Sequence, residues 1–213
     1  TLWAMRRWGR WKTATARIET LSGVVDVEWD PVGERVWISQ PAVQTRPLSA
    51  EQSGRVAAVL GLPDGTSLAM TNASTSRVKT LVQMHDVAAL QSLKPDFSAM
   101  EALCASIGST GLYPFALAGS TDGEPLVVPR QFPTSSAYPE DAATGIAAAA
   151  LWGHLAASGV VEVGRAAKPV VCTVRQGDAM GRPSAIAVKP GFGDMGAVVG
   201  CWVSGQVAWS VPS

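Results

Sequence analysis

The pattern of apolar and polar positions predicts a chain that begins with a helix and continues in strands. Residues 2–11 have helical spacing, and three segments after them alternate apolar and polar residues. In the second of these segments Val25, Val27 and Trp29 share one face. The turn-forming sequence Asp-Pro-Val-Gly at 30–33 predicts a hairpin with the third segment. The three strands are expected at 14–21, 23–29 and 35–39.

Capping residues mark the helices that follow. Ser49 and Gln52 form a capping box at the start of a helix that Gly61 ends. A second helix at 96–107 stops at Gly108 and carries five apolar residues on one face. These are Phe97, Met100, Leu103, Cys104 and Ile107, so Cys104 is interpreted as a core residue. Further strands are expected at 66–71, 77–84, 111–118, 125–132, 168–176, 184–189, 197–203 and 206–211.

The segment 142–158 predicts a helix of a different kind. Its run IAAAALW is apolar on every side, and Gly159 follows as a stop. Because such a helix has no polar face for solvent, we expect other elements to enclose it.

An internal repeat relates the two ends of the chain. The segments TLWAMRRWGRW, IETLSG and RVWISQP align in order with TGIAAAALWGHL, CTVRQG and SAIAVKP. The matched positions are Trp8 with Trp152, Gly9 with Gly153, Gly23 with Gly177, and Pro41 with Pro190. Thr1 falls opposite Thr144 or Gly145, which predicts one complete repeat and the back half of another. The predicted divisions are 1–49 for the back half of a first lobe, 50–190 for a complete second lobe, and 191–213 as a segment that can return to the first.

Composition and charge exclude several classes of protein. The 213 residues are 47% hydrophobic, and 17 basic residues balance 17 acidic ones. A disordered chain is excluded, and no basic field is available for nucleic acid or another polyanion. The uncharged stretch 142–161 is mostly Ala and Gly with His154 inside it, which argues against a membrane span, and no secretion signal opens the chain. We therefore expect a cytoplasmic protein in a reducing compartment.

The loop EDAATG at 140–145 is the strongest local candidate for a functional site. It leads into the enclosed helix, whose first turn offers free N–H groups and the positive end of the helix dipole. Gly145 permits close approach of a carboxylate or phosphate, and Asp141 adds a group able to accept or share a proton. A second interpretation stays open, in which Asp141 or Thr144 merely caps a buried helix.

Three motifs in order resemble those of a known family. RQF at 130–132, EDAATG at 140–145 and QGDAMGRPSAIAV at 176–188 are similar to the motifs of the phenazine biosynthesis PhzF-like isomerases, relatives of diaminopimelate epimerase. The resemblance runs over essentially the whole chain. It implies an α+β fold of two similar lobes, each a curved, mostly antiparallel sheet around a central helix. The active site of such a fold lies in the cleft where the two helix N-termini meet.

The resemblance also implies a reaction and roles for individual residues. It implies an isomerase or epimerase that moves a proton on a small carboxylate substrate by general acid/base catalysis, without metal or organic cofactor. Asp141 matches the motif aspartate that lines the cleft of the family, and it is the implied catalytic residue of this chain. The implied substrate-binding residues are Thr144, Gly145, Ile146 and Arg130. Ile146 departs from the pattern because the family usually has a small polar residue there, and Ala142 replaces the usual proline.

The family's first lobe contributes further groups that have no match here. These are an acid/base glutamate and a C-G-H-A-T motif, whose last residue Thr1 resembles, so we expect the others to lie upstream of this chain. Glu19, Glu28 and Glu34 follow the opening helix and take neither role. For the intact protein we favour the isomerase. The alternative is a catalytically inactive ligand-binding or assembly module of the same fold, a hypothesis that Ile146 and the upstream glutamate motivate.

The remaining reactive residues favour structural roles. Racemases related to this fold use one thiol ahead of each central helix, but Asp141 occupies that position, and Cys172 and Cys201 lie in strand-like runs. His154 is expected in the core, and no residues have the spacing of a metal site. The Trp- and Arg-rich opening is interpreted as the polar rim of a helix rather than a nucleic-acid or membrane surface. A homodimer is an option that the sequence does not decide.

Overall fold

The computed structural model describes residues 1–20, 23–121, 123–134, 138–207 and 209. Over these ranges the chain forms α-helices α1 (Leu2–Arg7), α2 (Ala50–Val59), α3 (Val87–Gln91), α4 (Phe97–Ile107) and α5 (Gly145–Ala157), with a 3-10 turn at Asp178–Met180. The strands are β1 (Thr15–Thr20), β2 (Gly23–Asp30), β3 (Arg35–Pro41), β4 (Gln44–Pro47), β5 (Met70–Ser74), β6 (Lys79–Gln83), β7 (Gly111–Thr121), β8 (Glu124–Pro129), β9 (Phe132–Pro133), β10 (Gly164–Arg165), β11 (Lys168–Pro169), β12 (Cys172–Gln176), β13 (Ser184–Phe192) and β14 (Val198–Gly205).

Twelve of the described strands form one mixed sheet. Its order is β1-β2-β3-β14-β13-β12-β8-β7-β6-β5-β4, with β9 paired to β7, and β10 and β11 form a separate two-stranded sheet. Neighbours are antiparallel except for β12 with β8 and β6 with β7. The late strand β14 lies between β13 and the early strand β3, where Gly200 pairs with Pro41. The two ends of the described chain are therefore joined through one ladder of backbone hydrogen bonds.

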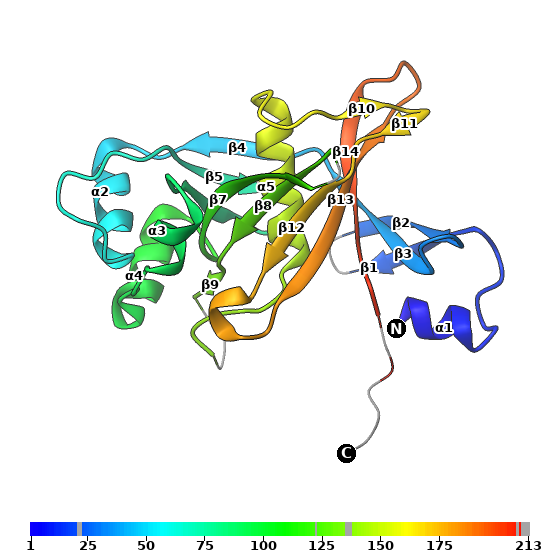
Figure 1. Cartoon of the computed structure of the whole chain (residues 1–213), viewed down its shortest axis with the longest axis horizontal. Helices are drawn as coiled ribbons and strands as arrows, with labels where there is room; N and C mark the ends of the chain where they lie inside the picture. The colour runs from blue at the N-terminus through cyan, green and yellow to red at the C-terminus, as the bar shows by residue number, and fades with distance from the viewer. Residues whose placement is uncertain (21–22, 122, 135–137, 208, 210–213) are drawn as a thin grey trace.

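Helix α5 lies at the centre of the molecule, with sheet strands around it (Figure 1). It contacts β5 and β6 on one side and β13 and β14 on the other. Its alanines Ala147–Ala150 and the larger Trp152 are buried in one core cluster with side chains from these strands. Because alanine side chains are small, the helix backbone can approach the strands closely. The prediction of an enclosed helix is confirmed.

A second core lies on the other face of the sheet. Helices α2, α3 and α4 gather beside β5–β7, at the left of Figure 1. Leu60, Leu90, Leu112 and Phe132 are among the fully buried side chains that fill the space between them. The sheet is thus covered on both faces in this region, with α5 on one and the three helices on the other.

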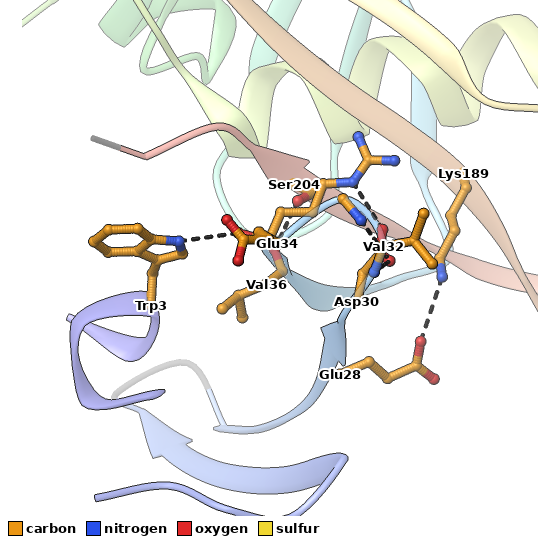
Figure 2. A network of polar contacts seen from close by, with 10 residues as sticks. Trp3, Glu28, Asp30, Val32, Glu34, Val36, Lys189 and Ser204 are labelled. Carbon is orange, nitrogen blue, oxygen red and sulfur yellow. Dashed lines mark hydrogen bonds and ion pairs between the residues drawn. The ribbon is translucent and has the colours of Figure 1, made fainter. Parts of the chain in front are cut away.

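The hairpin of β2 and β3 has a turn built on Asp30. Its Oδ1 accepts hydrogen bonds from the backbone N–H groups of Val32 and Gly33, each at 3.0 Å, and its Oδ2 pairs with Arg35 Nε at 3.1 Å. Helix α1 lies beside this hairpin, where Trp3 Nε1 donates to the Glu34 carbonyl at 2.9 Å (Figure 2). The hairpin and turn predicted from Asp-Pro-Val-Gly are confirmed.

The same hairpin is tied to the late strands by side chains. Lys189 of β13 pairs with Glu28 of β2 at 3.3 Å, and the Ser204 hydroxyl of β14 donates to the Val36 carbonyl at 2.8 Å (Figure 2). These contacts join residues more than 160 positions apart in sequence. They hold the β1–β3 region onto the remainder of the sheet.

Several predicted helices need correction. The opening helix ends at Arg7 rather than at residue 11, because Gly9 adopts a positive φ of 67° that a helix cannot continue through. The enclosed helix begins at Gly145 rather than at 142, because the preceding loop is held by side chains from β12 and β13. Phe97 is 44% exposed rather than in the core, although the other four residues on its predicted face are buried.

Three strand predictions also differ from the structure. The strand expected at 66–71 begins at Met70, since the residues before it form a turn in which Thr66 bonds back to Pro63. The strand expected at 168–176 is divided into β10's partner β11 and the longer β12. The strand expected at 197–203 is β14, which runs from Val198 to Gly205. The strand expected at 206–211 is wrong for residues 206, 207 and 209, which lie outside any strand, and residues 208, 210 and 211 lie outside the described residues. None of the helices in the described ranges combines the length and apolar character that crossing a bilayer requires.

The positions matched by the proposed repeat have partly similar surroundings. Gly23 and Gly177 both have positive φ, at 110° and 88°. Trp152 is buried in α5, whereas its counterpart Trp8 is 62% exposed. The repeat and the divisions at 1–49, 50–190 and 191–213 stay predictions, since the sheet runs without interruption from β13 to β3.

Candidate functional site

The loop that precedes α5 is fastened by two residues of the neighbouring strands. Gln176, at the end of β12, donates through Nε2 to the Asp141 carbonyl at 2.7 Å. Ser184, at the start of β13, donates through its hydroxyl to the Ala142 carbonyl at 2.7 Å. In Figure 1 the turn between β12 and β13 lies at the end of α5 where this loop enters. The backbone of Asp141 and Ala142 is therefore fixed from outside the loop.

Gly177 permits this arrangement. It has a φ of 88°, and a Cβ there would meet the carbonyl oxygens of Arg182 and, at 3.0 Å, Ala142. Both obstacles are backbone atoms, which cannot rotate away as a side chain would. A glycine is required where the turn passes this close to the candidate loop.

The Asp141 carboxylate is held by its own loop. Oδ2 accepts from the Thr144 hydroxyl at 2.5 Å, and within the part of the chain that the structure describes Oδ1 receives a long contact of 3.4 Å from the Ala143 N–H. The residue is half-buried. The backbone N–H of Asp141 also donates to the Gln131 carbonyl at 3.0 Å, which fixes the main chain of Asp141 beside Gln131.

The first turn of α5 has no side-chain cap among the described residues. Thr144 occupies the N-cap position, but its hydroxyl is directed to Asp141 instead of to a helix N–H. The first amide to bond back into the chain is that of Ala147, which donates to the Thr144 carbonyl at 3.1 Å. The side-chain cap expected under the second interpretation is therefore absent from the described residues, although Thr144 stands at the N-cap position. The amides of Gly145 and Ile146 stand at the positive end of a 13-residue helix, the arrangement that favours an anion.

A cleft of about 560 Å³ adjoins this helix end. Ile146 of α5 forms part of its wall, opposite the strands β1–β3, and Thr75 and Ser76 of the β5–β6 turn form another part. The remaining lining residues are Ile18, Thr20, Val24, Val25, Ile38, Ser39, Gln40 and Pro41. Its walls are thus mainly apolar near Ile146, with hydroxyl and amide groups among them. Asp141 and Thr144 are not among the lining residues.

Two buried titratable groups lie in the field of Asp141. Burial raises the pKa of the Tyr113 phenol well above its ordinary value, and the negative charge of Asp141 adds to this effect. Burial lowers the pKa of the Lys79 amine, Arg77 adds to this, and Asp141 opposes it. Tyr113 donates to Gln176 Oε1 at 2.8 Å, and Lys79 Nζ donates to the Thr110 carbonyl at 3.2 Å.

Arg130 is buried and surrounded by protein partners. It forms a two-pronged pair with Glu140, at 3.0 Å from Nε and 2.8 Å from Nη2. Its Nη1 donates to the carbonyls of Leu90, Gln91 and Leu93, at 3.0–3.3 Å. The guanidinium thus ties the residue before Asp141 to the end of α3. Its predicted contact with substrate stays a prediction, because these partners already engage all three guanidinium nitrogens.

The three cysteines are buried in the two core clusters. Burial raises the pKa of Cys104 to about 11 and those of Cys172 and Cys201 to about 12, so their thiols stay protonated near neutral pH. His154, in the second half of α5, is half-buried rather than in the core as expected, and partial burial lowers the pKa of its imidazole. Within the described ranges, no three His, Cys, Asp or Glu residues are grouped as metal ligands. The core interpretation of the thiols is confirmed.

Sequence reasoning missed the residues that hold the candidate loop. The sequence shows Gln176, Gly177 and Ser184 only as parts of a motif with a turn, and Tyr113 only as part of a strand. The signal was the motif itself, since it places Gln and Gly at the end of one strand and Ser at the start of the next. Their partners, however, lie 32–42 positions earlier in the chain, a separation that no local pattern reveals.

The comparisons with known proteins decide the family. The model of the phenazine biosynthesis-like proteins, PhzC-PhzF, matches residues 1–196. The chain belongs to this family. An uncharacterized isomerase of Deinococcus radiodurans is 31% identical over 189 residues, which are 85% of this chain and 59% of that protein. The chain therefore spans less than two thirds of the length of this curated relative.

Solved structures of the PhzF family share the fold. A phenazine biosynthesis protein of the PhzF family from Bacillus anthracis gives a TM-score of 0.77 at 20% identity, covering 97% of this chain and 70% of that one. A PhzF-family protein of Enterococcus faecalis gives 0.66 at 18% identity, covering 97% and 66%. A predicted epimerase of Pseudomonas aeruginosa gives 0.69 at 18% identity, covering 95% and 67%. The predicted two-lobed α+β fold is confirmed, and at this identity the likeness concerns the fold alone.

Proposed function

We propose that this PhzF-family chain carries one wall of an isomerase or epimerase site that moves a proton on a small carboxylate substrate. The observation that carries the proposal is the position of the Asp141 carboxylate beside the uncapped first turn of α5. The proposed proton carrier and the proposed anion site lie within the six consecutive residues 141–146. Membership of a family that includes an isomerase relative supports the same reaction class.

The substrate carboxylate would bind at the start of α5. The amides of Gly145 and Ile146 point out of the helix end, and the helix dipole favours a negative charge there. A carboxylate in this position places the rest of the substrate toward the cleft that Ile146 lines. Because Ile146 brings a hydrocarbon side chain to that wall, the site favours a substrate with an apolar body over one with a polar group at this point.

Asp141 would act as the proton carrier. A C–H bond next to a carboxylate and a double bond is weakened, because the electron pair left behind delocalises over both groups. The Asp141 carboxylate takes this proton, the electron pair stays on the substrate, and a proton is returned to another carbon or to the other face. No oxidation occurs, and no co-reactant is consumed. General acid/base groups of this kind contribute about 10²–10⁴-fold to a rate.

Arg130 would act on this reaction from a distance. Its pair with Glu140 fixes the residue that precedes Asp141, and its three carbonyl contacts anchor the pair to the end of α3. We therefore assign it a positioning role in the proposal, in addition to the substrate contact expected from the motif.

Solvent deuterium uptake tests the proposal. The chain is incubated in D₂O with 1-cyclohexenylacetate, an apolar β,γ-unsaturated carboxylate, and deuterium at carbon is followed by NMR. We expect uptake above the buffer rate, and a loss of at least about 100-fold in Asp141→Asn, which is similar in shape but cannot carry the proton. Asp194→Asn is the matched control, since Asp194 is an exposed aspartate in the β13–β14 turn, and it should exchange at the wild-type rate.

Two outcomes would overturn the isomerase proposal. Equal uptake by wild type and Asp141→Asn would remove Asp141 from the reaction. Saturable binding of the carboxylate without any uptake above the buffer rate would favour the alternative, a non-catalytic ligand-binding module of the same fold.

A further inference from the structure

Four polar groups form a continuous chain of hydrogen bonds that ends on the Asp141 carboxylate. The Tyr113 hydroxyl bonds to Gln176 Oε1 at 2.8 Å. Gln176 Nε2 bonds to Thr144 Oγ1 at 3.2 Å, and Thr144 Oγ1 bonds to Asp141 Oδ2 at 2.5 Å. Tyr113 and Gln176 are fully buried, so water does not compete for the inner half of the chain.

The direction of every donor in this chain is fixed by one acceptor. Gln176 also faces the backbone carbonyl of Asp141 at 2.7 Å, and a carbonyl can only accept. The amide must therefore present Nε2 to it, which turns Oε1 toward Tyr113. The Tyr113 hydroxyl then has to donate, and it retains the proton to do so because burial holds the pKa of this phenol far above neutral.

The same logic continues to the carboxylate. The second Nε2 hydrogen of Gln176 is directed at Thr144 Oγ1, which accepts it. The one hydrogen of the Thr144 hydroxyl is left for Asp141 Oδ2. Oδ2 is thus held by a short bond, while the contact of Oδ1 among the described residues is the 3.4 Å one with the Ala143 N–H. The two oxygens of one carboxylate are made unequal.

We propose that Gln176 and Tyr113 are positioning residues that fix the direction of this chain and leave Oδ1 of Asp141 as the oxygen that exchanges protons with the substrate. The inference rests on the proposed function, because it assigns the proton transfer to one atom of Asp141. Its structural half, the fixed direction of the Gln176 amide, is independent of any activity. The two halves can therefore be tested separately.

The first experiment reads the amide directly. In ¹⁵N-labelled wild-type protein both Gln176 Nε2 protons are bonded, so we expect two resolved side-chain signals that exchange slowly with solvent. Tyr113→Phe removes only the hydroxyl and leaves Oε1 without its donor in a buried place. We expect these signals to broaden or to exchange at least about tenfold faster, which corresponds to about 1.4 kcal/mol of lost protection.

The second experiment reads the reaction. With 1-cyclohexenylacetate in D₂O, Tyr113→Phe should lower kcat for deuterium uptake by about 10- to 100-fold, because the carboxylate is no longer held in one orientation. KM should change less than about twofold, since the carboxylate site at Gly145 and Ile146 is not altered. Thr80→Val is the matched control: it removes another fully buried hydroxyl bond, of 2.7 Å to Asn72, and should leave both readouts unchanged.

A pair of variants at Thr144 keeps the test decisive if Tyr113→Phe does not fold. Thr144→Ser retains the hydroxyl and should keep kcat within about threefold, whereas Thr144→Val should lose as much as Tyr113→Phe. Unchanged Gln176 signals in Tyr113→Phe, or equal kcat values for the Ser and Val variants, would overturn the inference. If wild type shows the two protected signals but no deuterium uptake, the proposed function fails and the fixed amide direction stands.

Discussion

At the scale of single residues, Gly177 links the family motif to the candidate site. Its positive φ and its approach to the Arg182 and Ala142 carbonyls leave no room for a side chain. Gly181, four positions later in the same turn, also has a positive φ, of 64°, but nothing lies within 4 Å of a Cβ built there. Comparing substitutions at the two glycines therefore separates the cost of backbone strain from the cost of steric collision.

We expect Gly177→Ala to lower the free energy of unfolding by about 2–4 kcal/mol, since strain and displaced backbone both contribute. Gly181→Ala should cost about 1 kcal/mol, from strain alone. Urea unfolding followed by tryptophan fluorescence measures both. Equal losses for the two variants would show that Gly177 is not in contact with the Asp141 loop.

The grouping of the candidate residues follows from the sequence more directly than the contacts that hold them. Asp141, Thr144 and Gly145 stand together in one motif at the start of a helix, so their proximity follows from local geometry. The contacts of Gln176 and Tyr113 depend on how β12 and β7 are placed beside that loop. Tertiary packing determines this placement, and the pattern of residues along the sequence does not indicate it.

At the scale of elements, short-range signals were reliable. The capping box of Ser49 and Gln52 is present at the start of α2, and Gly108 ends α4 in the left-handed conformation, because both depend on residues within four positions. The start of α5 was misplaced by three residues. There the backbone of 141 and 142 bonds to Gln176 and Ser184 from other strands, and this tertiary contact prevails over the helical preference of the alanines.

The β2–β3 turn gives a prediction that depends on pH. The backbone hydrogen bond from Gly33, and then the Arg35 side chain and the Val32 N–H, hold the pKa of Asp30 below its ordinary 3.8, although burial opposes this. A lowered pKa in the folded chain means that the stabilisation is complete above the ordinary pKa and is lost as the pH falls through the folded value.

We expect Asp30→Ala to lower the free energy of unfolding by about 1 kcal/mol at pH 7 and by less at pH 2. Asp30→Asn retains an oxygen acceptor for the two turn amides, so at pH 7 it should lose less than the alanine variant. Urea titrations at the two pH values provide the measurement. A difference from wild type that is the same at both pH values would contradict the role assigned to the ionised carboxylate.

At the scale of the whole molecule, α5 and the sheet around it place the site. The enclosed helix has its N-terminus beside the turn between β12 and β13 and beside the cleft against β1–β3. The turn between β12 and β13 holds the Asp141 loop, and the cleft offers a mainly apolar space next to Ile146. This arrangement follows from the return of β14 to β3, which brings the β1–β3 region to the same end of the helix.

The central claim is that a carboxylate binds at the first turn of α5, next to Asp141. Titration of ¹⁵N-labelled protein with benzoate, and separately with its neutral counterpart benzamide, tests it most directly. We predict saturable shifts that are largest at the Gly145 and Ile146 amides with benzoate and absent with benzamide. Shifts that are largest elsewhere in the chain, or that are equal for the two compounds, would contradict the claim.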